Sequence, residues 1–277
     1  MSNNLTRRRV LAGGATALLA SIAGCSGATP FVGKRTERTE TVALDGAERL
    51  AVQTDLGDVT IRTADREDID VHIVKQASSV TADITDLAFR VERSGDELLF
   101  RSEFTGDTEL LGGRPSMSLD VTVPEALPVS SVQSQVGDLD VEDVVGDLDA
   151  ETNTGDVRVR RVAGAVRATA STGDVVVDRP EALAGATTST GHVTVDVPAI
   201  DDDTRVESET GDVAAAVGRD VDAVLRARTS TGDVSVSGLS LSDSTRTDDL
   251  VTGTLGEGGP TLDIETDTGD VSVSALN

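Results

Sequence analysis

Residues Thr229–Val236 read T-S-T-G-D-V-S-V, and close copies of this stretch recur through the second half of the chain. The copies are N-T-G-D-V-R-V from Asn153, S-T-G-D-V-V-V from Ser171, S-T-G-H-V-T-V from Ser189, E-T-G-D-V-A-A from Glu209, D-T-G-D-V-S-V from Asp267 and a looser Q-V-G-D-L-D-V from Gln135. The spacing of their glycines is about 18 residues with a few insertions. A fixed period of this length indicates stacked structural repeats.

Each repeat alternates between apolar or small residues and polar residues. In residues 147–160, Leu148 and Ala150 alternate with acidic residues before the Gly, and Val157 and Val159 alternate with arginines after it. Period-2 alternation is typical of a strand that is buried on one face. Each repeat is therefore predicted to be two short strands joined at Thr-Gly-Asp, where Gly tolerates a positive φ and Asp bonds nearby backbone N–H groups.

Two all-β architectures fit this pattern. The first is a β-solenoid of roughly 18-residue, two-strand rungs, and the alternative is an antiparallel β-sandwich of hairpins. The solenoid is favoured because inward residues recur in type as well as in polarity, with Val or Ala after each Gly. Stacking equivalent residues about 4.8 Å apart requires such recurrence, whereas a sandwich does not.

Residues 1–24 have the features of an export signal. Arg7 and Arg8 begin a twin-arginine pattern, and an apolar run follows that is too short for a comfortable transmembrane helix. The run ends in Ile-Ala-Gly before Cys25, which resembles a lipobox and predicts lipidation of this single cysteine. The expected location is extracytoplasmic, on the outer face of the cytoplasmic membrane, with Cys25 and residues 26–40 as anchor and tether.

The remainder divides into two predicted parts. Residues 41–131 have strand signals without the period, so we expect an irregular β region that caps the stack at its N-terminal end. Residues 132–277 are the predicted repeat β-solenoid. Its last strand follows Gly269, and we expect that strand to present an open edge for self-association or for a surface or envelope partner.

The charge is strongly acidic, with 24 basic and 49 acidic residues and a net charge of −25. Lys34 and Lys75 are the only lysines, and the chain has no Trp or Tyr. This composition is typical of a halophilic protein, because salt screens the repulsion between dense carboxylates. Nucleic acid is excluded as a partner, because binding phosphates requires a basic face.

The turn aspartates are candidate cation ligands. On a solenoid they would form a column, interrupted by His192, and Gly-Asp repeats suggest calcium, as in a β-roll. The β-roll nonapeptide has more glycines than these repeats, so the favoured interpretation is that each Asp bonds the backbone of its own turn. The candidate column consists of Asp138, Asp156, Asp174, Asp212, Asp233 and Asp270.

No pattern of catalytic residues stands out. His72 and His192 are the only histidines, both predicted to be exposed, and a lipidated cysteine leaves no free thiol. Histidine-based triads, cysteine nucleophiles and histidine-rich metal centres therefore have little support. An envelope hydrolase that uses carboxylates alone is a third hypothesis, which would need a pocket holding a perturbed acid pair.

The recurring units resemble the adhesin-like β-strand-repeat family, a domain of unknown function, in its haloarchaeal, twin-arginine-exported lipoprotein type. Asp55–Val59 and the Gly256–Pro260 segment are similar to the two ends of that family's domain. The resemblance covers residues 41–277 and implies a β-solenoid-like fold and a cell-surface adhesin. It supplies no catalytic residue, so the expected function is a non-enzymatic surface lipoprotein, with a calcium-dependent β-roll as the alternative.

Overall fold

The computed structural model describes residues 33–78, 83–106 and 114–276. The described residues all belong to one compact unit. The predicted export signal with Arg7 and Arg8, and the predicted lipidation site Cys25, lie outside the described residues. Within the described ranges, no helix combines the length and the hydropathy that a membrane span requires.

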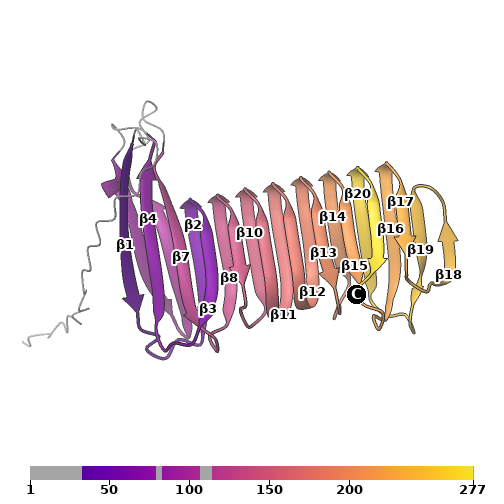
Figure 1. Ribbon diagram of the computed structural model, residues 1–277, viewed down its shortest axis with the longest axis horizontal. Helices are drawn as coiled ribbons and strands as arrows, with labels where there is room; N and C mark the ends of the chain where they lie inside the picture. The colour runs from indigo at the N-terminus through magenta and orange to yellow at the C-terminus, as the bar shows by residue number, and fades with distance from the viewer. Residues whose placement is uncertain (1–32, 79–82, 107–113, 277) are drawn as a thin grey trace, which may run out of the picture. The chain divides into compact units, whose positions relative to one another are not determined.

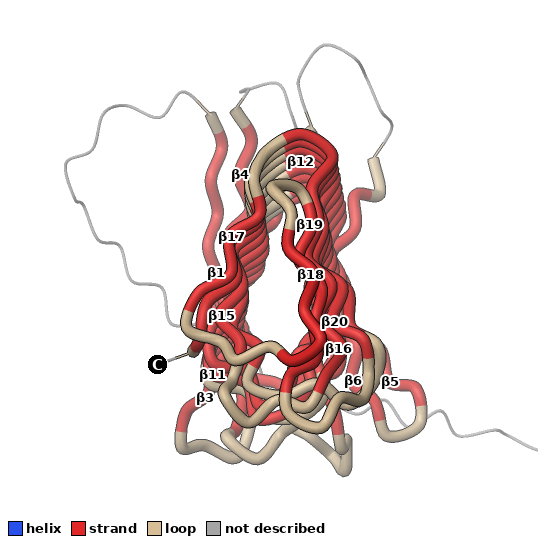
Figure 2. Tube along the Cα trace, turned by 90° about the vertical axis from the view of Figure 1, so that its right-hand side faces the viewer, coloured by secondary structure: helices blue, strands red, loops and turns tan. Residues whose placement is uncertain are grey.

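The described chain folds into two facing walls of mainly parallel strands (Figures 1 and 2). Two long strands, β11 (Val157–Thr172) and β12 (Val175–Thr190), connect the walls, because the first part of each lies in one wall and the second part in the other. The first wall contains, in spatial order, β1 (Lys34–Val42), β4 (Ile69–Ala77), β7 (Ser116–Pro124), β3 (Val59–Ala64), β9 (Leu139–Glu142), then the first parts of β11 and β12, β13 (Val193–Val197), β15 (Val213–Val217), β21 (Val271–Ala275) and β17 (Val234–Ser237). The second wall contains β5 (Leu87–Ser94), β6 (Glu97–Phe104), β2 (Arg49–Leu56), β8 (Val129–Val136), β10 (Leu148–Thr154), then the second parts of β11 and β12, β14 (Thr204–Thr210), β20 (Thr261–Thr268), β16 (Ala223–Thr231), β19 (Leu250–Leu255) and β18 (Ser242–Arg246).

Neighbouring rungs are in register, so equivalent residues of the repeat lie one above another. Val157 pairs with Val175, and Val175 pairs with Val193. This parallel pairing confirms the all-β solenoid and rules out the antiparallel sandwich. Figure 2 looks along the stack, with the two walls on either side.

The core between the walls is made of small and medium aliphatic side chains. In the regular rungs it consists of Val, Ala and Leu, which are nearly inaccessible to solvent. Equivalent inward positions differ in size along the stack: Ala150, Ala168 and Ala186 are alanines, whereas the same position is Val132 or Val206 in the flanking rungs. Phe100 is the one fully buried aromatic among the described residues, and it contacts Phe89 edge-to-face at 5.5 Å.

The N-terminal region is more regular than the sequence predicts. β2 and β3 form a complete rung that lies on β8 and β9, and β6 and β7 form a further rung on the outer side of β2 and β3. Antiparallel strands then end the stack, with β4 and β1 on one wall and β5 on the other. The prediction of an irregular region over residues 41–131 is therefore wrong for these two rungs. Their repeat pattern is hidden in the sequence because β4, η1 and β5 separate them along the chain.

The predicted tether also ends earlier than expected. Residues 34–40, which the sequence assigns to a polar tether, belong to β1, because nine consecutive residues of this strand pair with β4. The short 3-10 helix η1 (Ile84–Asp86) lies beyond β4 in the chain and begins with Asp83, whose carboxylate accepts a hydrogen bond from the Thr85 N–H.

The C-terminal rung is not at the end of the stack. β20 lies between β14 and β16, and β21 lies between β15 and β17, with parallel pairing on both sides. The expectation that the strand after Gly269 presents an open edge is wrong, because residues 218–260 fold outward first and the chain then returns into the gap. The free edges at this end belong to β17 and β18.

Candidate functional site

The Thr-Gly-Asp turns form a column of hydrogen bonds along one edge of the solenoid, which we call the turn ladder. In each step a side chain accepts a hydrogen bond from the backbone N–H of the equivalent residue in the next rung, at 2.8–3.1 Å. The order of the ladder is Asp58, Asp138, Asp156, Asp174, His192, Asp212, Asp270 and Asp233. The ladder therefore connects rungs rather than closing individual turns.

This geometry corrects two predictions. The turn aspartates were expected to bond the backbone of their own turns, but the donor is in the neighbouring rung. For example, Asp156 Oδ1 accepts from the Asp174 N–H at 2.9 Å, and the register of the parallel strands brings these atoms together. The ladder also begins earlier than predicted. Leu56–Val59 is a further copy of the turn, and the Asp58 N–H donates in turn to Ser118 Oγ of the adjacent rung at 3.2 Å.

His192 was expected to interrupt the column, and it continues it instead. Its Nδ1 accepts from the Asp212 N–H at 3.0 Å, so this nitrogen carries no proton and the imidazole has the Nε2–H tautomer. The side chain is 61% exposed, as predicted for a turn residue. His72 is also exposed, at 42%, and its nearest carboxylate is Glu37 at 3.9 Å.

The glycine before each turn residue is required by close approach of the backbones. Gly173 has φ +139°, and a Cβ placed on it would lie 1.9 Å from the carbonyl oxygen of Gly155 in the adjacent rung. An inward hydroxyl completes the turn, as Thr188 Oγ1 donates to the Gly173 carbonyl at 2.9 Å. The same contact is made by Thr152, Ser208, Thr229 and Thr266.

The electrostatics of the ladder are clearest at Asp156. The backbone N–H of Asp174 lowers the pKa of the Asp156 carboxyl, and Arg158 lowers it further. Arg158 Nη2 is 2.7 Å from Asp156 Oδ2, so both oxygens of this carboxylate accept hydrogen bonds. The ionised form is therefore the one that the fold stabilises.

Replacing Asp156 by alanine is expected to lower the free energy of unfolding by about 1–2 kcal/mol, because the Asp174 N–H loses a charged acceptor. Asp156→Asn keeps an acceptor and should lose less. Since the folded-state pKa of Asp156 is lowered, its contribution is present at neutral pH and is lost as pH falls through that pKa. Urea unfolding of both variants at pH 7 and in acid measures this, and equal midpoints for wild type and Asp156→Ala would contradict it.

The turn ladder does not assemble a metal site. No group of three or more His, Cys, Asp or Glu side chains in residues 33–78, 83–106 and 114–276 is placed to hold a metal ion. One oxygen of each aspartate in the ladder except Asp233, its last member, already accepts a backbone hydrogen bond. The remaining carboxylate oxygens of successive rungs are one strand spacing apart, about 4.8 Å.

We accordingly expect a calcium chelator to leave the fold unchanged. Circular dichroism of the protein in molar salt should give the same β signal and the same Tm with and without chelator, because backbone N–H groups already satisfy the turn carboxylates. Unfolding on chelation, reversed by added calcium, would overturn this expectation and support the β-roll alternative.

A pair of acids lies on the outer face of the first wall. Asp178 and Asp196 are in adjacent rungs, one residue after the paired Val177 and Val195. Burial raises the pKa of Asp196, and the neighbouring Asp178 raises it further, whereas the Arg179 side chain lowers the pKa of Asp178. The Arg179 N–H donates to Asp196 Oδ2 at 3.0 Å. The pair is an open feature of the wall and does not line the cavity described below.

Asp196→Asn is expected to raise the Tm by a few degrees at pH 7, because a raised carboxyl pKa means that the folded state disfavours the charge. The amide oxygen can still accept from the Arg179 N–H. Lowering the pH through the raised pKa protonates Asp196 in the wild type, so the advantage of the variant should disappear there. Thermal melts at pH 7 and in acid test this, and a lower Tm at pH 7 would contradict it.

A second charged cluster fastens the inserted C-terminal rung to its neighbours. Glu265 on β20 is only 7% exposed and accepts from Arg205 on β14, at 3.3 Å, and from Arg228 on β16. The two arginines come from the rungs on either side. Sequence reasoning missed this cluster because Glu265 is far from both arginines along the chain.

Comparisons with known proteins concern the fold. No curated protein matches this chain. Solved structures that are similar to it include a “putative cell adhesion protein” from Clostridium sporogenes (12% identity, TM-score 0.37, covering 88% of this chain and 100% of that one) and a “putative adhesin” from Bacteroides fragilis (12%, 0.43, 87% and 97%). A “Putative lipid binding protein” from Parabacteroides distasonis is similar at 8% identity and TM-score 0.32, covering 87% and 97%.

The family comparison concerns the later rungs of the solenoid. The matched residues begin in β12 and end in β21, so they include the rung that is inserted out of sequence order. The predicted resemblance to a β-repeat domain of unknown function is confirmed for this part of the chain: residues 182–274 match the Toastrack DUF4097 family.

Proposed function

We propose that this protein is a non-enzymatic interaction module of the cell surface, anchored to the outer face of the cytoplasmic membrane through Cys25. The observation that carries the proposal is the turn ladder. The polar groups that recur in every repeat are engaged in holding rungs together, so the repeats build a rigid scaffold rather than a series of reactive sites. Such a scaffold presents its two sheet faces to partners.

Adhesion, to other cells or to envelope components, is the activity that suits such a scaffold. The exposed faces of the walls are flat sheets whose ion pairs span neighbouring rungs, as where Arg160 reaches Asp140 at 2.8 Å. A repeated surface can make the same weak contact with a partner at many places at once, and the total binding is then much tighter than any single contact. We assign no catalytic role to the pair of Asp178 and Asp196, which lies on the open face of the wall.

The acidic composition supports a high-salt environment. The chain has a net charge of −25, and only two of its 24 basic residues are lysines, the others being arginines. We expect the fold to lose stability when salt is withdrawn, because unscreened carboxylates repel one another. A Tm that does not change between molar and millimolar salt would remove the halophilic part of the proposal.

The proposed anchoring and adhesion are tested with the full chain and Cys25→Ser, produced in a host that has twin-arginine export and lipoprotein processing. The wild type should fractionate with membranes and be cleaved by protease added to intact cells, whereas Cys25→Ser should be released. Cells that display the wild type should aggregate or attach more than cells that produce Cys25→Ser. Equal attachment would overturn the adhesin role, and membrane retention of Cys25→Ser would overturn the lipid anchor.

A further inference from the structure

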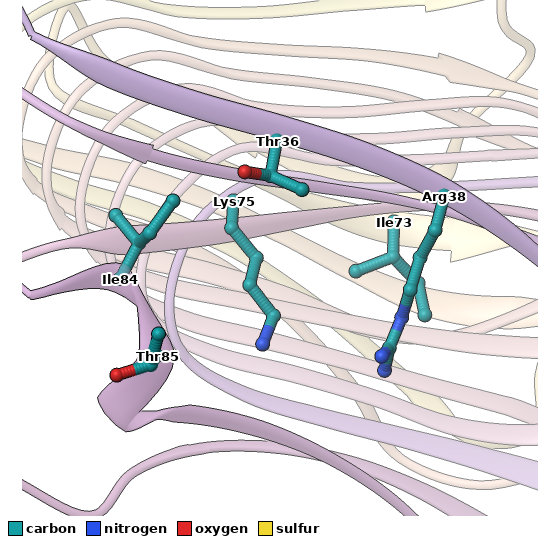
Figure 3. Close-up of a pocket in the computed structure, with 6 residues that line it drawn as sticks. All are labelled: Thr36, Arg38, Ile73, Lys75, Ile84 and Thr85. Atoms are coloured by element: carbon teal, nitrogen blue, oxygen red, sulfur yellow. The ribbon is translucent and has the colours of Figure 1, made fainter. Parts of the chain in front are cut away.

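A small cavity lies at the N-terminal end of the solenoid, where β1 and β4 extend the first wall and η1 covers part of it (Figure 3). Its volume is about 140 Å³. Six residues line it, and they are Thr36, Arg38, Ile73, Lys75, Ile84 and Thr85. None of them was singled out by the sequence as a site residue.

The register of β1 and β4 explains why these side chains share one face. Thr36 pairs with Lys75, and Arg38 pairs with Ile73. Ile73 is completely buried, so this is the inward face of the wall. In the regular rungs the inward positions hold aliphatic residues, threonine or serine. At this end they hold Arg38, Glu40 and Lys75 instead.

Two cations, Arg38 and Lys75, share one nearby carboxylate, that of Glu40. Arg38 Nη2 is 2.9 Å from Glu40 Oε1, and the Lys75 ammonium donates a hydrogen bond to the backbone carbonyl of Leu87. No carboxylate among the described residues forms an ion pair with Lys75. Burial lowers the pKa of Lys75 and the nearby Arg38 lowers it further, whereas Glu40 raises it.

The rest of the lining is suited to an apolar group. Ile73 and Ile84 face the cavity from β4 and η1, and Figure 3 shows the nitrogen atoms of Lys75 and Arg38 on the same side of the two strands. Thr36 and Thr85 add hydroxyl groups that can donate to an anion. A cavity of about 150 Å³ holds a benzene molecule, so this one has room for a ligand of similar size.

From this arrangement we propose that the cavity binds a small organic monocarboxylate, with its carboxylate between Arg38 and Lys75 and its short apolar tail against Ile73 and Ile84. The carboxylate would supply the charge that the two cations lack, and the guanidinium can hold it through paired hydrogen bonds. The tail would remove from water the part of Ile84 that is still exposed, since Ile73 is already completely buried. This binding is separate from the proposed adhesive role, since it uses the end of the solenoid rather than its walls.

The test is isothermal titration calorimetry of the full chain with sodium benzoate and sodium butyrate, at constant chloride concentration. The proposal expects saturable binding of at least one of them, weakened at least ten-fold in Lys75→Met and in Arg38→Gln. The matched control is Arg35→Gln, which removes an arginine from the opposite face of the same strand and should bind as the wild type does. Circular dichroism melts show whether each variant is folded.

Two further probes decide which chemistry the cavity selects. Inorganic phosphate tests the charge without a tail, and benzyl alcohol tests the tail without a charge. Both are expected to bind at least ten-fold more weakly than benzoate. If phosphate binds as tightly as benzoate, the cavity is a simple anion site and the proposal is wrong. If benzyl alcohol binds as tightly as benzoate, the two cations play no part in binding. Absence of saturable binding of both benzoate and butyrate to the folded wild type would overturn the proposal outright.

If Lys75→Met and Arg38→Gln do not fold, Lys75→Arg provides a second route. This variant keeps the positive charge, but the guanidinium group of arginine is larger than the lysine ammonium group and leaves less space for the tail of the ligand. The ratio of the affinities for benzoate and butyrate should therefore change. Unchanged affinities for both carboxylates in folded Lys75→Arg would contradict the proposed place of the ligand.

Discussion

Gly173→Ala is expected to abolish the cooperative unfolding transition or to lower its midpoint severely. The new methyl group would lie 1.9 Å from the Gly155 carbonyl oxygen, at a backbone φ of +139° that side chains rarely adopt. Backbone strain alone costs about 1–3 kcal/mol, and separating two hydrogen-bonded rungs adds to it. We expect a total loss of about 4 kcal/mol or more, a large part of the stability of a typical domain. Urea denaturation followed by circular dichroism measures it.

Gly95→Ala is the matched control for this prediction. Gly95 also has a positive φ, +63°, but a methyl group there would have nothing within 4 Å. Gly95→Ala should lower the free energy of unfolding only by the backbone strain, about 1 kcal/mol. If both variants lose the same stability, the close approach of the rungs contributes nothing, and the explanation given for the Gly of each turn is wrong.

Deletion of residues 261–277 is expected to prevent folding of the C-terminal part of the solenoid. It removes four core side chains that are completely buried, Leu262, Ile264, Val271 and Val273. At about 1.5–3 kcal/mol for each side chain, their loss is comparable to the whole stability of a domain. It also leaves open edges on β14 and β16, which face each other across the gap. Size-exclusion chromatography and circular dichroism should show aggregation and loss of β signal.

The control deletion removes an edge instead of an interior rung. Replacing residues 240–248 by a short Gly-Ser linker removes β18, which pairs only with β19 and whose residues are all exposed. That variant should stay folded, with a Tm a few degrees lower. If the deletion of residues 261–277 is tolerated equally well, β14 and β16 must be able to pair directly, and the inserted rung would not be needed for the fold.

The regular part of the solenoid could be predicted from the sequence because its cause is local. Alternation of apolar and polar residues selects strands, and Gly at a fixed spacing marks the turn that every rung shares. Residues 147–190 illustrate this, since their strands and turns follow the repeat closely. The role of the turn aspartates was predicted only in part, because the sequence shows that Asp156 can accept a hydrogen bond but not which rung supplies the donor.

The order of the rungs could not be predicted, for a physical reason. The turn copies S-T-G-D-V-S-V, from Ser230, and D-T-G-D-V-S-V, from Asp267, are nearly identical. Either rung would therefore make the same turn contacts next to β14 and β15, and the buried strand positions differ only in detail, as where Ala227 replaces Ile264. Contacts outside the repeat distinguish them, above all the pairing of Glu265 with arginines on both sides. The cavity was equally hidden, because Arg38 and Lys75 come together through the pairing of β1 with β4.

The inserted rung has a mechanical consequence. A pulling force applied at residue 276 reaches β21 and then β20, and each of these strands is held by a ladder of hydrogen bonds on both sides. An outermost rung would peel away by breaking one ladder, whereas this rung must break two, together with the contacts of Glu265. The strands that would first bear tension from that end are thus held on both sides, which suits the adhesive role proposed above.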